Sequence, residues 1–296
     1  MNVVTRLFGS SLVELDEFHH PAGEVHRDPD EERAAGYSIS WVEKGSFDVA
    51  IDRRQWRVDS GVVFVSRPGM VFRCHHDEEA PRDVCLSMEY ERKFVEDICR
   101  AENLNPERFS PVVPLTNRLA WLRLRLKQAS TVSDEAITAE VLAGDVLAAT
   151  FACGNPNTRR LYKERQLTWY AERVEAAREL IESHYATPHS LETLASYVGM
   201  SPYHFARVFS ELTGIPPHRY LLKVRLARAA VQLRDGVSVT ETCFASGFNH
   251  PGYFTRVFQQ TFGIAPSEYR SGGTHRESAA VTAAFRTNGP GRSSNE

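Results

Sequence analysis

Two arginines occupy equivalent places in two nearly identical stretches of this sequence. The first stretch is SPYHFARVFSELTGIPPHRY, beginning at Ser201, and the second is HPGYFTRVFQQTFGIAPSEY, beginning at His250. Aligning the two stretches superposes Arg207 on Arg256. A guanidinium can donate two hydrogen bonds to the O6 and N7 atoms of one guanine in the major groove of DNA. The repeated arginine therefore predicts a pair of side chains that bind DNA bases.

Each stretch supplies the second helix of a predicted helix-turn-helix unit. In both copies a serine precedes an apolar-periodic run, and a glycine ends the first helix; the second copy, SVTE from Ser238, has the form of a capping box. The second helix restarts at Ser201-Pro202 and at His250-Pro251, with proline at the first helical position. Apolar residues at positions i, i+3, i+4 and i+7 must face inward, which leaves each arginine on the outward face.

We expect the outward faces of both second helices to contact base pairs. The predicted base contacts are Tyr203, Ala206, Arg207, Gly252, Thr255, Arg256 and Gln259. Between the units, PHRYLLKVRLARAAVQLRDG predicts one long helix that fixes their separation and carries cations toward phosphates. The predicted phosphate contacts are Ser201, Arg219, Lys223, Arg225 and His250. Two such units predict a double-stranded operator with two boxes about one helical turn apart.

The composition is that of an ordinary protein of about two domains, with 296 residues, 42% hydrophobic and 25% charged, and a formal net charge of -3. Basic residues gather between Tyr203 and Arg234, whereas acidic residues crowd the N-terminal segment. The five cysteines are scattered and lack a CxxC pair, so they predict neither a disulfide framework nor a structural zinc site. With neither a membrane-spanning run nor a secretion signal, we expect a cytoplasmic protein.

The segment from Tyr37 to Tyr90 alternates apolar and polar residues, and Gly, Pro and Asp interrupt it every several positions. This pattern predicts an antiparallel sheet or small barrel. A small barrel can enclose one ligand lined by aromatic side chains. The predicted pocket residues are Trp41, Phe47, Trp56 and Phe72. Ordinary core packing explains the same four residues equally well.

Two helices are predicted after this sheet, the second one near Ile137 to Phe151. They either close the side of the barrel or pair with a second copy of the chain, and we expect a homodimer. A stripe of leucines is the predicted dimer contact: Leu115, Leu119, Leu122 and Leu126. The Gly- and Pro-containing segment CGNPNTRR then predicts a linker. The expected organisation is an effector-binding and dimerisation domain over 1–152, a linker over 153–169, a DNA-binding domain over 170–270 and a disordered tail over 271–296.

The repeated motifs resemble those of the AraC/XylS family of bacterial transcription regulators, over about Val174 to Arg270. The resemblance implies an α+β protein: an N-terminal antiparallel, cupin-like β-barrel with flanking helices, and an all-α C-terminal domain of two helix-turn-helix units joined by a long helix. It also implies a small-molecule effector in the barrel, a homodimer and, for an activator, contact with RNA polymerase. In this family the base contacts lie early in each second helix, where Ala206 and Gly252 offer little side chain.

The alternative is a cupin-type metal-dependent enzyme, or a redox or metal sensor, fused to a DNA-targeting module. YSISWVEKGSFDVAIDRRQWRVDSGVVFVSRPGMVFR follows the strand order of the cupin-like domain, but Phe72 stands where metal-using cupins place a histidine after PGxx. The cluster Cys74, His75, His76 and Cys85 keeps zinc binding or oxidant sensing open. Neither the Pro-Cys-His string of DNA-repair methyltransferases nor another catalytic motif is present. The sequence therefore predicts a transcription regulator with no catalytic residues, metal or cofactor.

Overall fold

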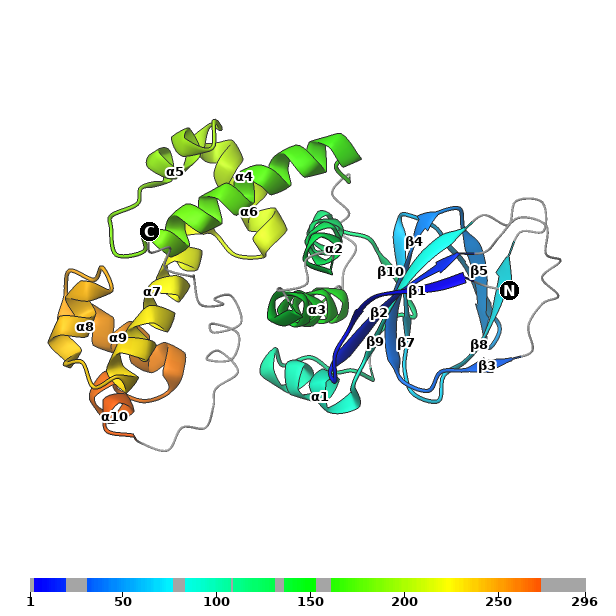
Figure 1. Ribbon diagram of the computed structural model, residues 1–296, viewed down its shortest axis with the longest axis horizontal. Coiled ribbons are helices and arrows are strands. Elements are labelled where there is room, and N and C mark those ends of the chain that lie inside the picture. The colour runs from blue at the N-terminus through cyan, green and yellow to red at the C-terminus, as the bar shows by residue number, and fades with distance from the viewer. Residues whose placement is uncertain are drawn as a thin grey trace. The chain divides into compact units, whose positions relative to one another are not determined.

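The chain folds into two compact units in the computed structural model, residues 1–161 and 162–296 (Figure 1). The structure describes residues 3–19, 31–76, 83–107, 109–130, 136–152 and 161–272. The predicted linker thus lies outside the described residues up to residue 160, and the predicted disordered tail does so from residue 273 onward. The end of the predicted linker is wrong, because helix α4 (Glu164–Ser183) includes residues 164–169 and already buries Leu167.

The strands of the first unit form two antiparallel sheets. The six-stranded sheet has the order β1 (Val3–Gly9), β2 (Val13–His19), β9 (Val84–Tyr90), β4 (Tyr37–Lys44), β7 (Val62–Ser66) and β10 (Val112–Pro114). The four-stranded sheet has the order β3 (Glu32–Arg33), β8 (Val71–His76), β5 (Phe47–Ile51) and β6 (Arg54–Val58). The antiparallel architecture expected from the alternating residues is confirmed.

Alternation along β4 separates two apolar layers. Val42 packs with Phe47, Val49 and Phe64 in a cluster between the two sheets. Trp41 points to the opposite face of the six-stranded sheet, where it lies against Leu115 and the helices α2 (Asn117–Ser130) and α3 (Ala136–Phe151). The Tyr90 hydroxyl donates a hydrogen bond of 3.1 Å to the carbonyl of Ala143 and so ties the sheet to α3. A further helix, α1 (Arg92–Ala101), follows β9.

The predicted dimer contact is wrong for a simple reason of packing. Leu115, Leu119, Leu122 and Leu126 are 8%, 3%, 1% and 1% exposed within a single chain. These four leucines pack within the same chain, on the side of its sheet, so their side chains have almost no exposed surface that a second chain could contact. Closing the side of the sheet, one of the two roles that the sequence left open for these helices, is observed, and pairing with a second copy through another face stays a prediction.

The second unit is entirely helical in its described residues and contains the predicted pair of helix-turn-helix units. The first unit of the pair is α5 (Leu191–Tyr197) with α6 (Pro202–Thr213), and the second is α8 (Val239–Ala245) with α9 (Pro251–Phe262). The long helix α7 (Pro217–Arg234) joins them, and α10 (Pro266–Arg270) follows the second. None of the described helices of the chain is both long enough and apolar enough to cross a bilayer.

The two copies of the repeated sequence pack their helices in the same way. The inward residues of α6 are fully buried, and Phe209 meets Tyr220 of α7 edge to face, with ring centroids 5.6 Å apart. Phe258 and Tyr269 make the equivalent contact at 5.2 Å in the second copy. The capping is less symmetrical than expected. Ser238 only accepts a hydrogen bond from Glu241, whereas the reciprocal capping box lies in the first copy, at Ser190.

The two turn glycines give a matched test of this packing. Gly199 and Gly247 both have positive φ, 68° and 80°. A Cβ at residue 199 would meet nothing within 4 Å, whereas one at residue 247 would lie 2.6 Å from the carbonyl oxygen of Ala186. Gly199→Ala should therefore cost only the backbone strain, about 1 to 2 kcal/mol. Gly247→Ala adds a backbone clash that raises the cost by about 1 to 3 kcal/mol more.

Urea denaturation followed by far-ultraviolet circular dichroism measures the difference. Equal losses of unfolding free energy in the two variants would contradict the close approach of Gly247 to Ala186.

Candidate nucleic-acid interface

Helices α6 and α9, called here the reading helices, carry all seven residues predicted to contact bases. Each helix begins with a proline and ends at a glycine of positive φ, Gly214 or Gly263. Tyr203 is 81% exposed near the start of α6, and Gly252, Arg256 and Gln259 are exposed on α9. Ala206, Arg207 and Thr255 are half-buried. Contact of these residues with bases stays a prediction.

Tyr253 is a surface residue of α9 that the sequence analysis missed. It is 45% exposed, and the guanidinium carbon of Arg256 lies 5.5 Å from the centroid of its ring. The two residues are one helical turn apart, so the spacing i, i+3 could have identified the pair. His204 holds the corresponding place in α6, and its Nε2 atom lies 3.5 Å from an Nη atom of Arg207. Each reading arginine thus lies against a ring one turn earlier.

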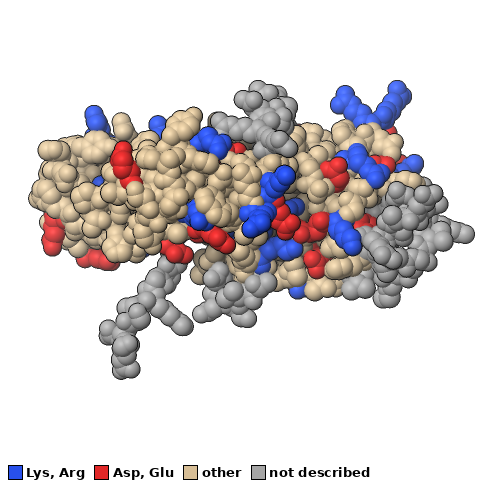
Figure 2. Space-filling model, turned by 90° about the horizontal axis from the view of Figure 1, so that it is seen from above, with Lys and Arg blue, Asp and Glu red and all other residues tan. Residues whose placement is uncertain are grey.

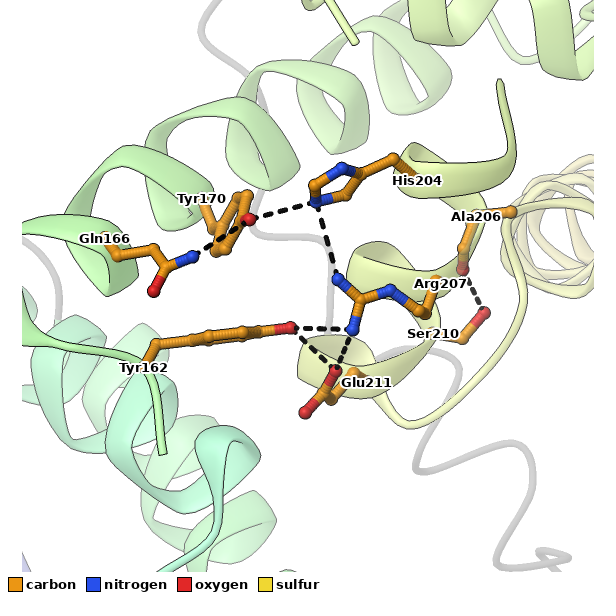
Figure 3. Close-up of polar contacts among 8 residues, drawn as sticks. All are labelled: Tyr162, Gln166, Tyr170, His204, Ala206, Arg207, Ser210 and Glu211. Carbon is orange, nitrogen blue, oxygen red and sulfur yellow. Dashed lines mark hydrogen bonds and ion pairs between the residues drawn. The ribbon is translucent and has the colours of Figure 1, made fainter. Parts of the chain in front are cut away.

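Arg207 is enclosed by polar groups from α6 and from the start of the second unit (Figure 3). Its Nη1 atom lies 3.6 Å from the carboxylate of Glu211 and 3.5 Å from the hydroxyl of Tyr162. The Tyr162 hydroxyl in turn donates a hydrogen bond of 2.7 Å to Glu211. Burial, followed by this bond to Glu211, raises the pKa of Tyr162 to about 12, so the hydroxyl keeps its proton at neutral pH.

A second arm of the same network runs through Tyr170 of α4. The Tyr170 hydroxyl and the Nε2 atom of His204 are 2.9 Å apart, and the side-chain amide of Gln166 donates to that hydroxyl at 3.2 Å. The rings of Tyr162 and Tyr170 pack with centroids 4.8 Å apart. Tyr170 of α4 and Tyr162, just before α4, therefore cover the side of α6 that carries Arg207 (Figure 3).

The predicted phosphate contacts differ in their surroundings. Ser201, Arg219 and His250 are exposed, and Lys223 is half-buried. Arg225 is bound within the unit: its Nε atom donates to the carbonyl of Tyr185 at 2.7 Å, and an Nη atom donates to the carbonyl of Thr187 at 2.9 Å. These carbonyls belong to the connection between α4 and α5. Arg225 therefore has a structural task that competes with contact to a phosphate.

The face shown in Figure 2 carries charges of both signs. On the face shown in Figure 2, Lys and Arg side chains are interspersed with Asp and Glu among the described residues, without a broad patch of one sign. Non-specific DNA affinity grows with the number of phosphates that a protein neutralises, so we expect this face to contribute little non-specific affinity.

A cavity of about 510 Å³ lies between the two sheets of the first unit. Such a volume is within the range of small-molecule sites. Serine hydroxyls of the six-stranded sheet line one side in two pairs: Ser38 with Ser66 at 2.8 Å, and Ser40 with Ser87 at 2.9 Å. The aromatic lining residues include Phe18, Tyr37, Phe47, Phe64 and Phe72.

Only part of the predicted pocket faces this cavity. Phe47 and Phe72 line it, whereas Trp41 lies on the other face of the sheet and Trp56 is not among the lining residues. The serines were missed, although the alternation in YSISWV places Ser38 and Ser40 opposite Trp41 and so contained the signal. Four serines thus share the lining with five aromatic residues, whereas the sequence predicts a lining of aromatic side chains alone.

Two thiols of the predicted metal or redox cluster line the same cavity. Burial raises the pKa of Cys74 to about 12, and burial together with Asp83 raises the pKa of Cys85 further. Both thiols therefore stay protonated at neutral pH, which disfavours their reaction with oxidants. Within the described ranges, no three His, Cys, Asp or Glu residues gather into a candidate metal site. The side chain of His76 and the whole of Cys153 lie outside those ranges.

Both units are similar to known protein families. The model of an AraC-like ligand binding domain matches residues 19–143, and that of a helix-turn-helix domain matches residues 194–272. The transcriptional activator and DNA repair enzyme Ada of Escherichia coli is 36% identical over 87 residues, which are 29% of this chain and 25% of Ada. The transcriptional activator RhaS of Escherichia fergusonii is 36% identical over 93 residues, 31% of this chain and 34% of RhaS.

The chain thus spans about a quarter to a third of the length of these curated relatives. Among solved structures, fatty acid-bound ToxT from Vibrio cholerae matches 90% of this chain and 99% of its own, at 15% identity and a TM-score of 0.37.

The two kinds of cation on α7 give a testable contrast. Arg225→Ala removes two hydrogen bonds to carbonyls and should lower the free energy of unfolding by about 1 to 3 kcal/mol. Arg219→Ala should leave stability unchanged and reduce the slope of log K for DNA binding against log salt by about one. Urea denaturation and binding titrations at several salt concentrations check both. The reverse assignment of the two effects would show that Arg225 is the phosphate contact.

Proposed function

Because the chain belongs to the AraC/XylS family of regulators, we propose that it is a sequence-specific, DNA-binding transcription regulator controlled by a small-molecule effector. The matched placement of Arg207 and Arg256 on two reading helices is the observation that carries the proposal. The intervening α7 has 18 residues, a rise of about 27 Å, which is on the order of one turn of B-DNA. The two arginines are then suited to reading two boxes on the same side of one duplex.

The cavity between the sheets is the proposed effector site. Hydroxyls both donate and accept hydrogen bonds, so the paired serines suit a ligand with hydroxyl or amide groups on one edge. The phenylalanines suit an apolar opposite edge. The charged residues of the described lining, Glu32, Arg33 and Glu89, are exposed, so none of them is a buried counter-charge for an ion, which favours an uncharged ligand. Such a ligand controls DNA binding only by its difference in affinity for two arrangements of the chain.

Further parts of the function are supported by analogy with the relatives alone. We place the protein in the cytoplasm, as an activator that forms a homodimer and contacts RNA polymerase; Ada and RhaS are both described as activators. The dimer surface is not the buried leucine stripe. The proposed role is binding rather than catalysis, with no metal or cofactor.

Selection from a random-sequence duplex library tests the DNA-binding role. We expect the full-length protein to enrich two boxes about one helical turn apart. Arg207→Ala and Arg256→Ala should each lower specific affinity by about 1 to 3 kcal/mol and relax the preference at one base pair of a different box. Arg53→Ala, which removes the same charge from an exposed turn of the first unit, is the matched control. Failure to enrich any motif would contradict the proposal.

Filling the cavity tests the effector site. A panel of uncharged polyols and amides, screened by thermal shift, should contain compounds that raise the melting temperature of the protein, because a ligand at about 100 times its Kd adds about 2.7 kcal/mol of stability. Ser40→Leu inserts a larger side chain into the lining and should abolish these shifts while DNA binding in the absence of ligand persists. Ser60→Leu, at an exposed turn, should leave them unchanged. Shifts that survive Ser40→Leu would place the ligand elsewhere.

A further inference from the structure

Arg207 on α6 and Arg256 on α9 differ in their contacts and in their exposure to solvent. In α6, Arg207 contacts Glu211, Tyr162 and His204, and its side chain is 37% exposed. In α9, Arg256 is exposed and packs on Tyr253, and no carboxylate in the described part of the chain forms an ion pair with it. When the repeats are aligned, Gln260 occupies the place of Glu211. The second copy therefore serves as an internal reference for the first.

The contacts of Arg207 oppose its proposed use. A two-bond contact with guanine requires two N–H groups directed at the edge of one base. Here Nη1 faces Glu211 and Tyr162, while Nη2 faces His204. These partners lie on α6 or just before α4, so the guanidinium is directed toward Tyr162, His204 and Glu211 (Figure 3). In this arrangement both Nη atoms of Arg207 have partners within the protein, which a two-bond contact with a base has to replace.

Glu211 gives the contact its strength. Its side chain is only 11% exposed, so water screens the attraction to Arg207 less than it does in a surface ion pair. If Arg207 swings toward DNA, the Glu211 carboxylate keeps the Tyr162 hydroxyl but loses this cation and approaches phosphates of the same sign. Gln260 imposes neither cost on Arg256. Opening is therefore unfavourable in the first copy alone.

Tyr162 links this contact to the rest of the chain. It is the first residue of the second unit and precedes α4, which begins at Glu164. The backbone that arrives from the ligand-binding unit thus enters the DNA-binding unit at the residue whose hydroxyl contacts both Glu211 and Arg207. A change in the path of the chain at this boundary moves Tyr162 directly.

We propose that Tyr162 and Glu211 hold Arg207 in a closed position, so that the first helix-turn-helix unit reads its box only after this contact opens. The second unit needs no such opening, because none of the described carboxylates forms an ion pair with Arg256. The proposal rests on the proposed function, in which Arg207 reads a base. It assigns regulation of that reading to a contact at the entrance of the DNA-binding unit.

Tyr162→Phe is the test, because it removes only the hydroxyl and keeps the ring that packs on Tyr170. The affinity of the full-length protein is measured by fluorescence anisotropy for the duplex enriched from the random library. Loss of one hydrogen bond that favours the closed position should raise the affinity about threefold. Tyr197→Phe makes the same change at a tyrosine of α5 that is 61% exposed, and should have no effect.

Tyr162→Phe is then made in the Arg207→Ala background, which completes a double-mutant cycle. We expect it to leave the affinity for the duplex unchanged in that background. A fall in affinity with Tyr162→Phe would overturn the proposal, since the hydroxyl would then position Arg207 for DNA. An unchanged affinity, or an equal rise in both backgrounds, would also overturn it. Specific binding that survives Arg207→Ala alone removes the reading role of Arg207 itself, which is a failure of the proposed function and is recognised separately by that single variant.

Discussion

A buried cation on α4 organises the DNA-binding unit. Arg178, whose side chain is 9% exposed, donates a hydrogen bond of 2.9 Å to the Tyr220 hydroxyl of α7 and forms ion pairs with Glu175 at 2.8 Å and Glu182 at 3.6 Å. Removing one partner of such a cluster leaves an uncompensated charge in a poorly solvated place. The cluster fixes α4 against α7, and α4 then carries Tyr170 to the flank of α6. The surroundings of Arg207 therefore depend on a charge that does not touch it.

Local patterns were enough to predict the double helix-turn-helix unit. Prolines at the first helical position, glycines of positive φ after α6 and α9, and the i, i+3, i+4, i+7 spacing of apolar residues all act within one or two turns of helix. Such signals do not require knowledge of distant partners. The first unit is different. Alternation divides β4 into two faces, but only the pairing with distant strands decides that Ser40 faces the cavity and Trp41 faces α2 and α3.

The tasks of individual arginines could not be predicted for the same reason. Arg219 and Arg225 look alike on the predicted long helix, yet one is exposed and the other binds the carbonyls of Tyr185 and Thr187. Likewise Arg207 and Arg256 are equivalent in the repeat; Glu211 against Gln260 is a difference that the sequence shows, but the contact with Tyr162, far away in sequence, is not. Residue type and spacing identify which side chains are able to bind DNA, whereas tertiary contacts decide which of them instead bind groups of the protein itself.

The position of Gly247 has a consequence for the DNA. Its turn lies close to the backbone of Ala186, between α4 and α5, so a pivot of the second helix-turn-helix unit about α7 has to break this contact. One additional base pair between two boxes would rotate the second box by about 35° and move it by about 3.4 Å along the helix axis. A flexible connection between the two helix-turn-helix units would let them follow such a change in helical phase, whereas the close contact of Gly247 with Ala186 opposes it. Under the proposed function, the contact at this turn makes binding sensitive to an inserted base pair between the boxes as well as to base identity.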